Sequence, residues 1–184
     1  MSTYFCVKAH PSCRISPAAG ILGTVNIGEN VSIWGGAQVR ADEETITIGA
    51  NSNIQECAVL HIDRGFPLEI GEGVTIGHGA IVHGCTIESG CTIGMGAVVL
   101  NGAHIGAGSM VAAGAVVPQG KVFGERSLIV GVPGKLVRTL SEAEAKEMCS
   151  AAADSYVQMS AEMVAEGAMF NPDADWHGQT GGAR

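Results

Sequence analysis

Residues 70–117 read IGEGVTIGHGAIVHGCTIESGCTIGMGAVVLNGAHIGAGSMVAAGAVV, and an aliphatic residue recurs there at every sixth position, with one residue missing after Val82. The period extends toward the N-terminus and is broken by three extra residues after Val39 and four after Leu60. The repeating aliphatic positions are Ile15, Ile21, Ile27, Ile33, Val39, Ile48, Ile54, Leu60, Ile70, Ile76, Val82, Ile87, Ile93, Val99, Ile105, Val111 and Val117. A period of six fits neither an α-helix nor a long alternating strand. It predicts short strands joined by tight bends, each strand pointing one aliphatic side chain inward.

This repeat resembles the hexapeptide-repeat family over roughly residues 10–135. The resemblance implies a mainly β fold, a left-handed parallel β-helix with three hexads in each coil. The left hand comes from the family alone, because ordinary crossovers between parallel strands are right-handed. We therefore expect residues 1–140 to form the β-helix domain.

A helix is predicted after the β-helix. Ser141 and Glu144 have the spacing of a capping box. A one-sided apolar stripe follows, formed by Met148, Ala152, Tyr156, Met159 and Met163. We expect residues 141–167 to form a C-terminal helix packed on the β-helix or on a neighbouring subunit, and residues 168–184 to form a flexible tail.

Composition excludes several classes of function. The 184 residues carry 10 basic and 18 acidic side chains, so a net charge of −8 argues against nucleic-acid or anionic-membrane partners. No apolar run approaches the roughly 20 residues that span a bilayer, and the first residues lack the order of a signal peptide, so we expect a cytoplasmic protein. The six cysteines form no C-x-x-C pair, and we expect most of them to be buried apolar residues.

The period places histidines in space. With three hexads per coil, Val39, Leu60 and Val82 stack in one column, so the residues that follow them stack as well. His61 and His83 should then lie on adjacent coils, roughly 4.8 Å apart, with Arg40 one coil below His61.

His78 belongs to the preceding hexad and points from a different face of the same chain. It can meet His61 and His83 only from a neighbouring chain, and a ring of three subunits is the simplest that suits a prism with three faces. Three imidazoles with a fourth position open to water form a catalytic zinc arrangement. The spacing therefore predicts a homotrimer with one metal ion at each subunit interface. His10, His104 and His177 are interpreted as ordinary surface histidines.

A closer resemblance rests on VRAD (39–42), NIQECAVLH (53–61) and IGHGAIVHGCTI (76–87), which are similar to motifs of the gamma-class carbonic anhydrases. In that family, three histidines bind zinc, iron or cobalt between the subunits of a trimer, and a metal-bound hydroxide converts carbon dioxide to bicarbonate. The resemblance implies that His61, His78 and His83 are metal ligands and that Arg40 and Asp42 form a supporting pair between subunits. It also implies that Gln55 hydrogen-bonds the metal-bound solvent, that Asn53 is the nearby catalytic Asn, and that Glu43 helps proton transfer.

Two departures from that family leave alternatives open. The long acidic loop of the founding members is reduced here to residues 62–69, and the tyrosine expected near the end of the β-helix is replaced by SLIVG (127–131). We therefore expect slow hydration. The ending GVPGK (131–135) is similar to that of acyl-CoA-dependent acyltransferases of the same superfamily, which remain the alternative enzyme class. A non-catalytic, metal-stabilised trimer is the third interpretation.

Overall fold

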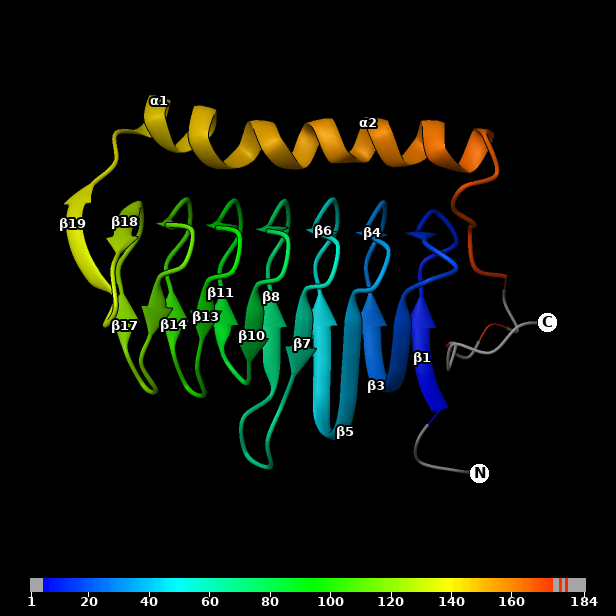
Figure 1. Cartoon of the computed structure of the whole chain (residues 1–184), viewed down its shortest axis with the longest axis horizontal. Coiled ribbons are helices and arrows are strands. Elements are labelled where there is room, and N and C mark those ends of the chain that lie inside the picture. The colour runs from blue at the N-terminus through cyan, green and yellow to red at the C-terminus, as the bar shows by residue number, and fades with distance from the viewer. Residues whose placement is uncertain (1–4, 174–175, 177, 179–184) are drawn as a thin grey trace.

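The computed structural model describes residues 5–173, 176 and 178 and shows a parallel β-helix with one long helix lying along it (Figure 1). One sheet has eleven strands and covers two sides, because the long strands β3 (Gly20–Ile27) and β5 (Gln38–Ile48) run from one side to the next. Its other strands are β1 (Phe5–Ala9), β7 (Val59–His61), β8 (Leu68–Ile70), β10 (Ile81–His83), β11 (Thr86–Ile87), β13 (Val98–Val99), β14 (His104–Ile105), β16 (Val116–Val117) and β17 (Val122–Phe123).

The third side is a sheet of eight strands, parallel except for the last pair. Its strands are β2 (Arg14–Ile15), β4 (Ser32–Ile33), β6 (Asn53–Ile54), β9 (Thr75–Ile76), β12 (Thr92–Ile93), β15 (Met110–Val111), β18 (Ser127–Val130) and β19 (Lys135–Thr139). Most strands are only two or three residues long, which is the length that a six-residue repeat leaves between two bends. The predicted mainly β, hexapeptide-repeat fold with a C-terminal helix is confirmed.

The strand register agrees with the period counted along the chain. Val39 pairs with Leu60, Leu60 with Val82, and Val82 with Val99. The three extra residues after Val39 appear as a shift of register between β3 and β5. Each repeating aliphatic side chain is buried, so the core is a thin stack of aliphatic layers running the length of the β-helix.

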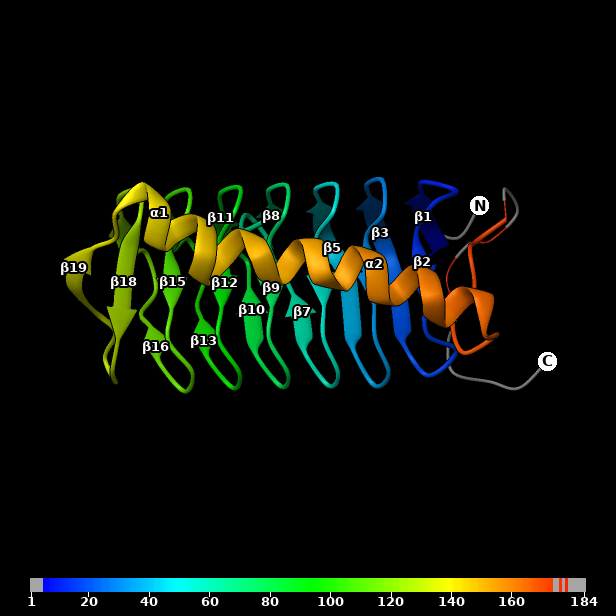
Figure 2. The same ribbon diagram turned by 90° about the horizontal axis from the view of Figure 1, so that it is seen from above.

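The helical segment begins as predicted at Ser141, whose hydroxyl accepts from the Glu144 N–H while the Glu144 carboxylate accepts from the Ser141 N–H. It consists of α1 (Glu142–Ala145), a π-helical turn over Lys146–Ser150, and α2 (Ala151–Ala165). The helix lies over the eight-stranded sheet, crossing it from the β18 end toward the β2 end (Figure 2). Across the described residues, no helix is both long enough and apolar enough to cross a bilayer.

The face that the helix buries differs from the predicted stripe. The buried residues are Ala145, Cys149, Ala153 and Ser160, whereas Met159 is 40% exposed. Small side chains at these positions let the helix lie close to the sheet, so the larger residues of the predicted stripe flank the contact instead of filling it. Four cysteines are buried and two, Cys6 and Cys57, are exposed, which agrees with the expectation for most of them.

The segment after the helix is packed where the structure describes it. Phe170 forms a two-way backbone bridge with Ile15, and the Asn171 amide donates to the Cys13 carbonyl. Within the expected tail of residues 168–184, Phe170 and Asn171 therefore pair with the first coil. Residues 174–175, 177 and 179–184 of that tail lie outside the described residues.

Candidate functional site

His61 and His83 stand side by side at the ends of β7 and β10. They are register partners, with ring centroids 4.8 Å apart, and Arg40 is the register partner of His61 on the coil before. Nδ1 of His61 lies 2.8 Å from Nε2 of His83. The column that the period predicts is therefore present, with its three polar members in the predicted order.

The two nitrogens that face each other are called inner here, and the other nitrogen of each ring is called outer. Each outer nitrogen faces an oxygen. Nε2 of His61 lies 3.2 Å from Oδ1 of Asp42, and Nδ1 of His83 lies 2.6 Å from Oδ1 of Asn101. The Asn101 amide nitrogen donates to Asp63, which fixes its carbonyl oxygen toward His83. A carboxylate and an amide oxygen only accept, so both outer nitrogens donate.

When both rings are neutral, the two inner nitrogens both carry lone pairs, and these face each other at 2.8 Å. Two lone pairs at that distance repel unless a cation lies between or beside them. Paired imidazole nitrogens of this kind suit zinc, iron and cobalt alike. His61 and His83 therefore suit two of the three ligand positions of the predicted metal site.

Asp42 and Glu43 lie beside this pair. Arg40, Asp42, Glu43 and His61 line one hollow of about 500 Å³. The Asp42 carboxylate pairs with Arg40 of the same chain. Its pKa lies below the ordinary value, because hydrogen bonds from its own backbone N–H and from His61, with the charge of Arg40, outweigh the desolvation that raises it.

The Glu43 carboxylate contacts Arg64 and not a histidine. Its Oε2 accepts from the Arg64 backbone N–H at 3.2 Å, and its other oxygen lies 3.7 Å from the Arg64 guanidinium. Glu44 similarly accepts from Gly65, so both carboxylates fasten the short loop that follows β7. Glu43 thus shares the hollow with His61 but has a structural contact within the chain.

Gln55, Asn53 and His78 form a second group at another corner of the β-helix. Gln55 is only 6% exposed. Its carbonyl oxygen accepts from the His78 backbone N–H at 3.1 Å, and its amide donates to Asn53, which donates to Thr75. One N–H of Gln55 remains free of these bonds and is available to an incoming oxygen.

A tyrosine from the helix completes this second group. Tyr156 lines a pocket of about 340 Å³ with Gln55, His78 and Met95. Its ring stands edge-on to the buried Trp34, 5.3 Å between centroids. Burial, and secondarily the charge of Glu56, raises its pKa.

Sequence reasoning missed Asn101 and the position of Tyr156. Asn101 reaches His83 because Gly84 has no side chain: a Cβ there would lie 2.5 Å from the Asn101 amide oxygen. One coil of three hexads on from Gly84, less the residue missing after Val82, leads to Asn101. The period could therefore have placed Asn101 beside Gly84 and near His83. No repeat relates the helix to the coils, so nothing in the periodicity could have placed Tyr156.

The described residues contain no group of three or more histidines, cysteines or acidic residues placed to hold a metal within one chain. His78 and His61 line different hollows, and His83 lines neither of the two. Of the other histidines, His104 pairs with Glu88 at 2.8 Å, and His10 contacts Ser12. His177 lies outside the described residues.

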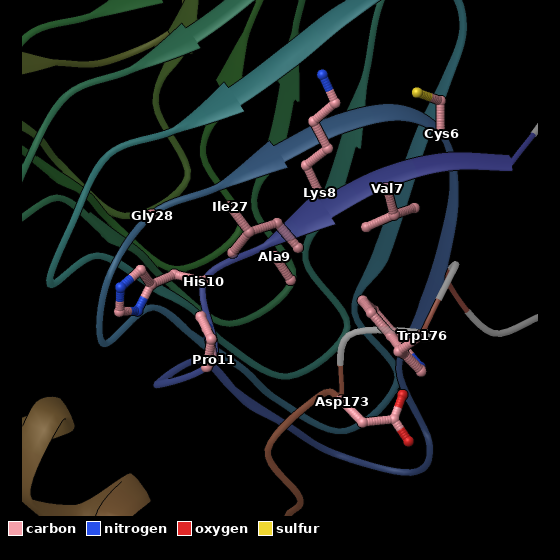
Figure 3. Close-up of a pocket in the computed structure, with 10 residues that line it drawn as sticks. All are labelled: Cys6, Val7, Lys8, Ala9, His10, Pro11, Ile27, Gly28, Asp173 and Trp176. Atoms are coloured by element: carbon pink, nitrogen blue, oxygen red, sulfur yellow. The ribbon is translucent and has the colours of Figure 1, made fainter.

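A separate hollow of about 700 Å³ lies at the N-terminal end, between β1 and the side chains of Asp173 and Trp176 (Figure 3). Its polar side chains do not converge: Lys8 and Cys6 point away from Asp173 and Trp176 in this view. None of the predicted site residues lines it.

Comparison with known proteins relates the chain to two groups. Residues 67–101 and 84–119 match the family model described as bacterial transferase hexapeptide (six repeats). The "Probable carbonic anhydrase" of Methanocaldococcus jannaschii is 46% identical over 135 residues, which cover 73% of this chain and 85% of that protein. Gamma carbonic anhydrase 1, mitochondrial, of Arabidopsis thaliana is 37% identical over 67 residues, covering 33% of this chain and 24% of that protein.

Solved structures share the fold. A hexapeptide transferase family protein from Anaplasma phagocytophilum superimposes with a TM-score of 0.80 at 35% identity, covering 85% of this chain and 92% of that one. A hexapeptide-repeat acetyltransferase from Vibrio cholerae, solved with acetyl coenzyme A, gives a TM-score of 0.56 at 26% identity, covering 63% and 71%.

Proposed function

Because this chain belongs to the gamma carbonic anhydrase family of hexapeptide-repeat proteins, we propose that it catalyses the reversible hydration of carbon dioxide to bicarbonate. The site would lie between subunits of a cytoplasmic homotrimer, with His61 and His83 from one chain and His78 from the next. The single observation that carries the proposal is the facing pair of imidazole nitrogens, 2.8 Å apart, with both outer nitrogens held by acceptors.

The neutral imidazoles of His61, His83 and the neighbouring chain's His78 would hold a zinc ion, which would lower the pKa of a bound water to about 7. Iron or cobalt can occupy the same donor set. The residues of the chain prepare the site around the ion. Asp42 and Asn101 hold the two rings with their inner lone pairs together, and a bound cation removes the repulsion between those lone pairs.

Gln55 and Asn53 would orient the reacting oxygens. The carbonyl oxygen of Gln55 is engaged with the His78 backbone, so the amide offers its remaining N–H and acts as a donor. A donor suits the developing charge of bicarbonate. Tyr156 and Met95 would bound the pocket on the side of the helix, where an apolar wall suits carbon dioxide.

Acyl transfer from an acyl-CoA is the second candidate, favoured by the match to the bacterial transferase hexapeptide model. The structure of the Vibrio cholerae acetyltransferase with acetyl coenzyme A has the same fold. The adjacent His61 and His83, each with its own acceptor, favour metal binding over a single catalytic base. A metal-stabilised trimer without activity is the third candidate.

One experiment separates the three functions. Protein purified without oxygen is analysed for metal, then assayed for carbon dioxide hydration in its zinc and iron forms and for turnover of acetyl-CoA. The proposal expects about one ion per chain and hydration by at least one form. Acetyl-CoA turnover without hydration would establish the transferase, and metal without either activity would establish the structural trimer.

A further inference from the structure

The His78 ring has a carboxylate neighbour of its own. Oε2 of Glu56 lies 2.7 Å from Nδ1 of His78. Glu56 directly follows Gln55, which holds the His78 backbone, so consecutive residues of one coil contact both the backbone and the ring of the same histidine on the next. Nothing in the motifs or the comparisons assigns a role to Glu56.

Oε2 of Glu56 has few possible hydrogen-bond donors. Oε2 is buried, and no group among the described residues forms a fully aligned hydrogen bond with it. The ring of His78 is the donor within reach of this oxygen. The last side-chain torsion of His78 is soft, so the ring can adjust its angle to this oxygen.

From this geometry we propose that Glu56 is a positioning residue for His78, holding Nδ1 protonated and leaving the lone pair on Nε2. The inference rests on the proposed metal site. A carboxylate that accepts from the outer nitrogen fixes both the tautomer and the ring direction of a metal-binding histidine. Glu56 would then do for His78 what Asp42 and Asn101 do for His61 and His83, so every predicted ligand has its own acceptor.

Stability alone does not explain the pair. The side chains of Glu56 and His78 are 45% and 47% exposed, and ion pairs this exposed contribute little to folding. The chain offers a matched control in Glu88 and His104, which lie 2.8 Å apart with side chains 40% and 39% exposed. That second pair lies away from every predicted site residue, so it tests whether any Glu–His pair matters.

The experiment uses the full chain with Glu56→Ala, Glu56→Gln and Glu88→Ala. Zinc affinity is measured by competition with a chromogenic chelator. In parallel, 15N NMR of the metal-free proteins, at a pH where the rings are neutral, reports which nitrogen of each histidine carries the proton. Molar mass and thermal unfolding report assembly and folding.

Glu56→Ala is expected to weaken zinc binding about 10- to 100-fold and to convert His78 from the Nδ1–H form to a mixture. Glu56→Gln keeps an acceptor oxygen and should lose less. Glu88→Ala should keep the wild-type affinity. A Glu56→Ala protein with unchanged His78 tautomer, or with wild-type affinity where wild type binds zinc, overturns the inference.

Failure of the proposed function would give a different set of results from failure of the Glu56 inference. If wild-type protein binds no zinc, the metal site itself is wrong, whatever Glu56 does. The NMR comparison then decides alone whether Glu56 fixes the His78 ring, because it needs no metal. If unfolding shows that Glu56→Ala is not folded, a Glu56→Leu chain, which also lacks an acceptor oxygen, supplies the tautomer comparison in its place: a mixed His78 ring there supports the inference, and an unchanged one overturns it.

Discussion

Nδ1 of His61 and Nε2 of His83 face each other at 2.8 Å, although the outer nitrogen of each ring already faces an acceptor. This relationship follows from adjacent coils: two histidines in one register column must stand about one strand spacing apart. A repeat that normally carries small or apolar residues there has placed two imidazole side chains in contact. The third ligand has to come from elsewhere, and His78 is the candidate.

Arg40→Ala should weaken assembly more than chemistry. The guanidinium donates hydrogen bonds and cannot bind a cation, and its partner Asp42 also holds His61. The side chain is half exposed in the single chain, so we expect the concentration for half-dissociation of the trimer to rise about tenfold. For a trimer that dissociates into three monomers, this is about 2.7 kcal/mol per trimer. Light scattering on dilution gives that concentration, and turnover is measured on the trimers that remain. A variant that stays trimeric but loses turnover would make Arg40 catalytic.

Hydration should be slow and should rise with buffer concentration. Proton export needs a relay, and the nearby carboxylates are engaged: Glu43 accepts from Arg64, and Asp63 accepts from Asn101. Small imidazole buffers should substitute for the missing relay, most clearly at high pH, where proton removal limits the rate. Stopped-flow assays at constant ionic strength measure the effect. A rate independent of buffer would reveal an internal relay.

Glu144→Gln should destabilise the protein at neutral pH but not at pH 2. The hydrogen bond from Arg138, and then that from the Ser141 N–H, lowers the pKa of Glu144 to about 2 from an ordinary 4.5. A depressed folded-state pKa means that the contribution is present above pH 4.5 and is lost as the pH falls toward 2. Denaturant midpoints at pH 7 and pH 2 test this. Equal midpoints for the two proteins at pH 7 would contradict it.

The β-helix could be predicted in detail because its signal is local and repeated. Each hexad carries its own aliphatic residue and bend, so the insertion after Val39 and the deletion after Val82 could be counted, and the column of Arg40, His61 and His83 followed from arithmetic. The hand of the coil came only from the family.

The parts that could not be predicted depend on contacts outside the repeat. Tyr156 reaches the pocket because small residues let the helix lie close to the sheet, and no period links the helix to the coils. Phe170 pairs with Ile15 across most of the chain, which composition does not indicate. Asn101 can approach His83 only because Gly84 has no side chain. This contact joins two bends and not two strands, so strand register does not reveal it.

The central claim is that each metal site takes His61 and His83 from one chain and His78 from its neighbour. Metal-free His61→Ala and His78→Ala chains are unfolded together, refolded as mixed trimers, separated by different tags and analysed for zinc per trimer. Neither variant alone can complete a site, but each mixed trimer has one interface with all three histidines. We predict about three ions per wild-type trimer, about one per mixed trimer and none in either parent. Mixed trimers without metal, or a parent variant that binds zinc normally, would contradict the account.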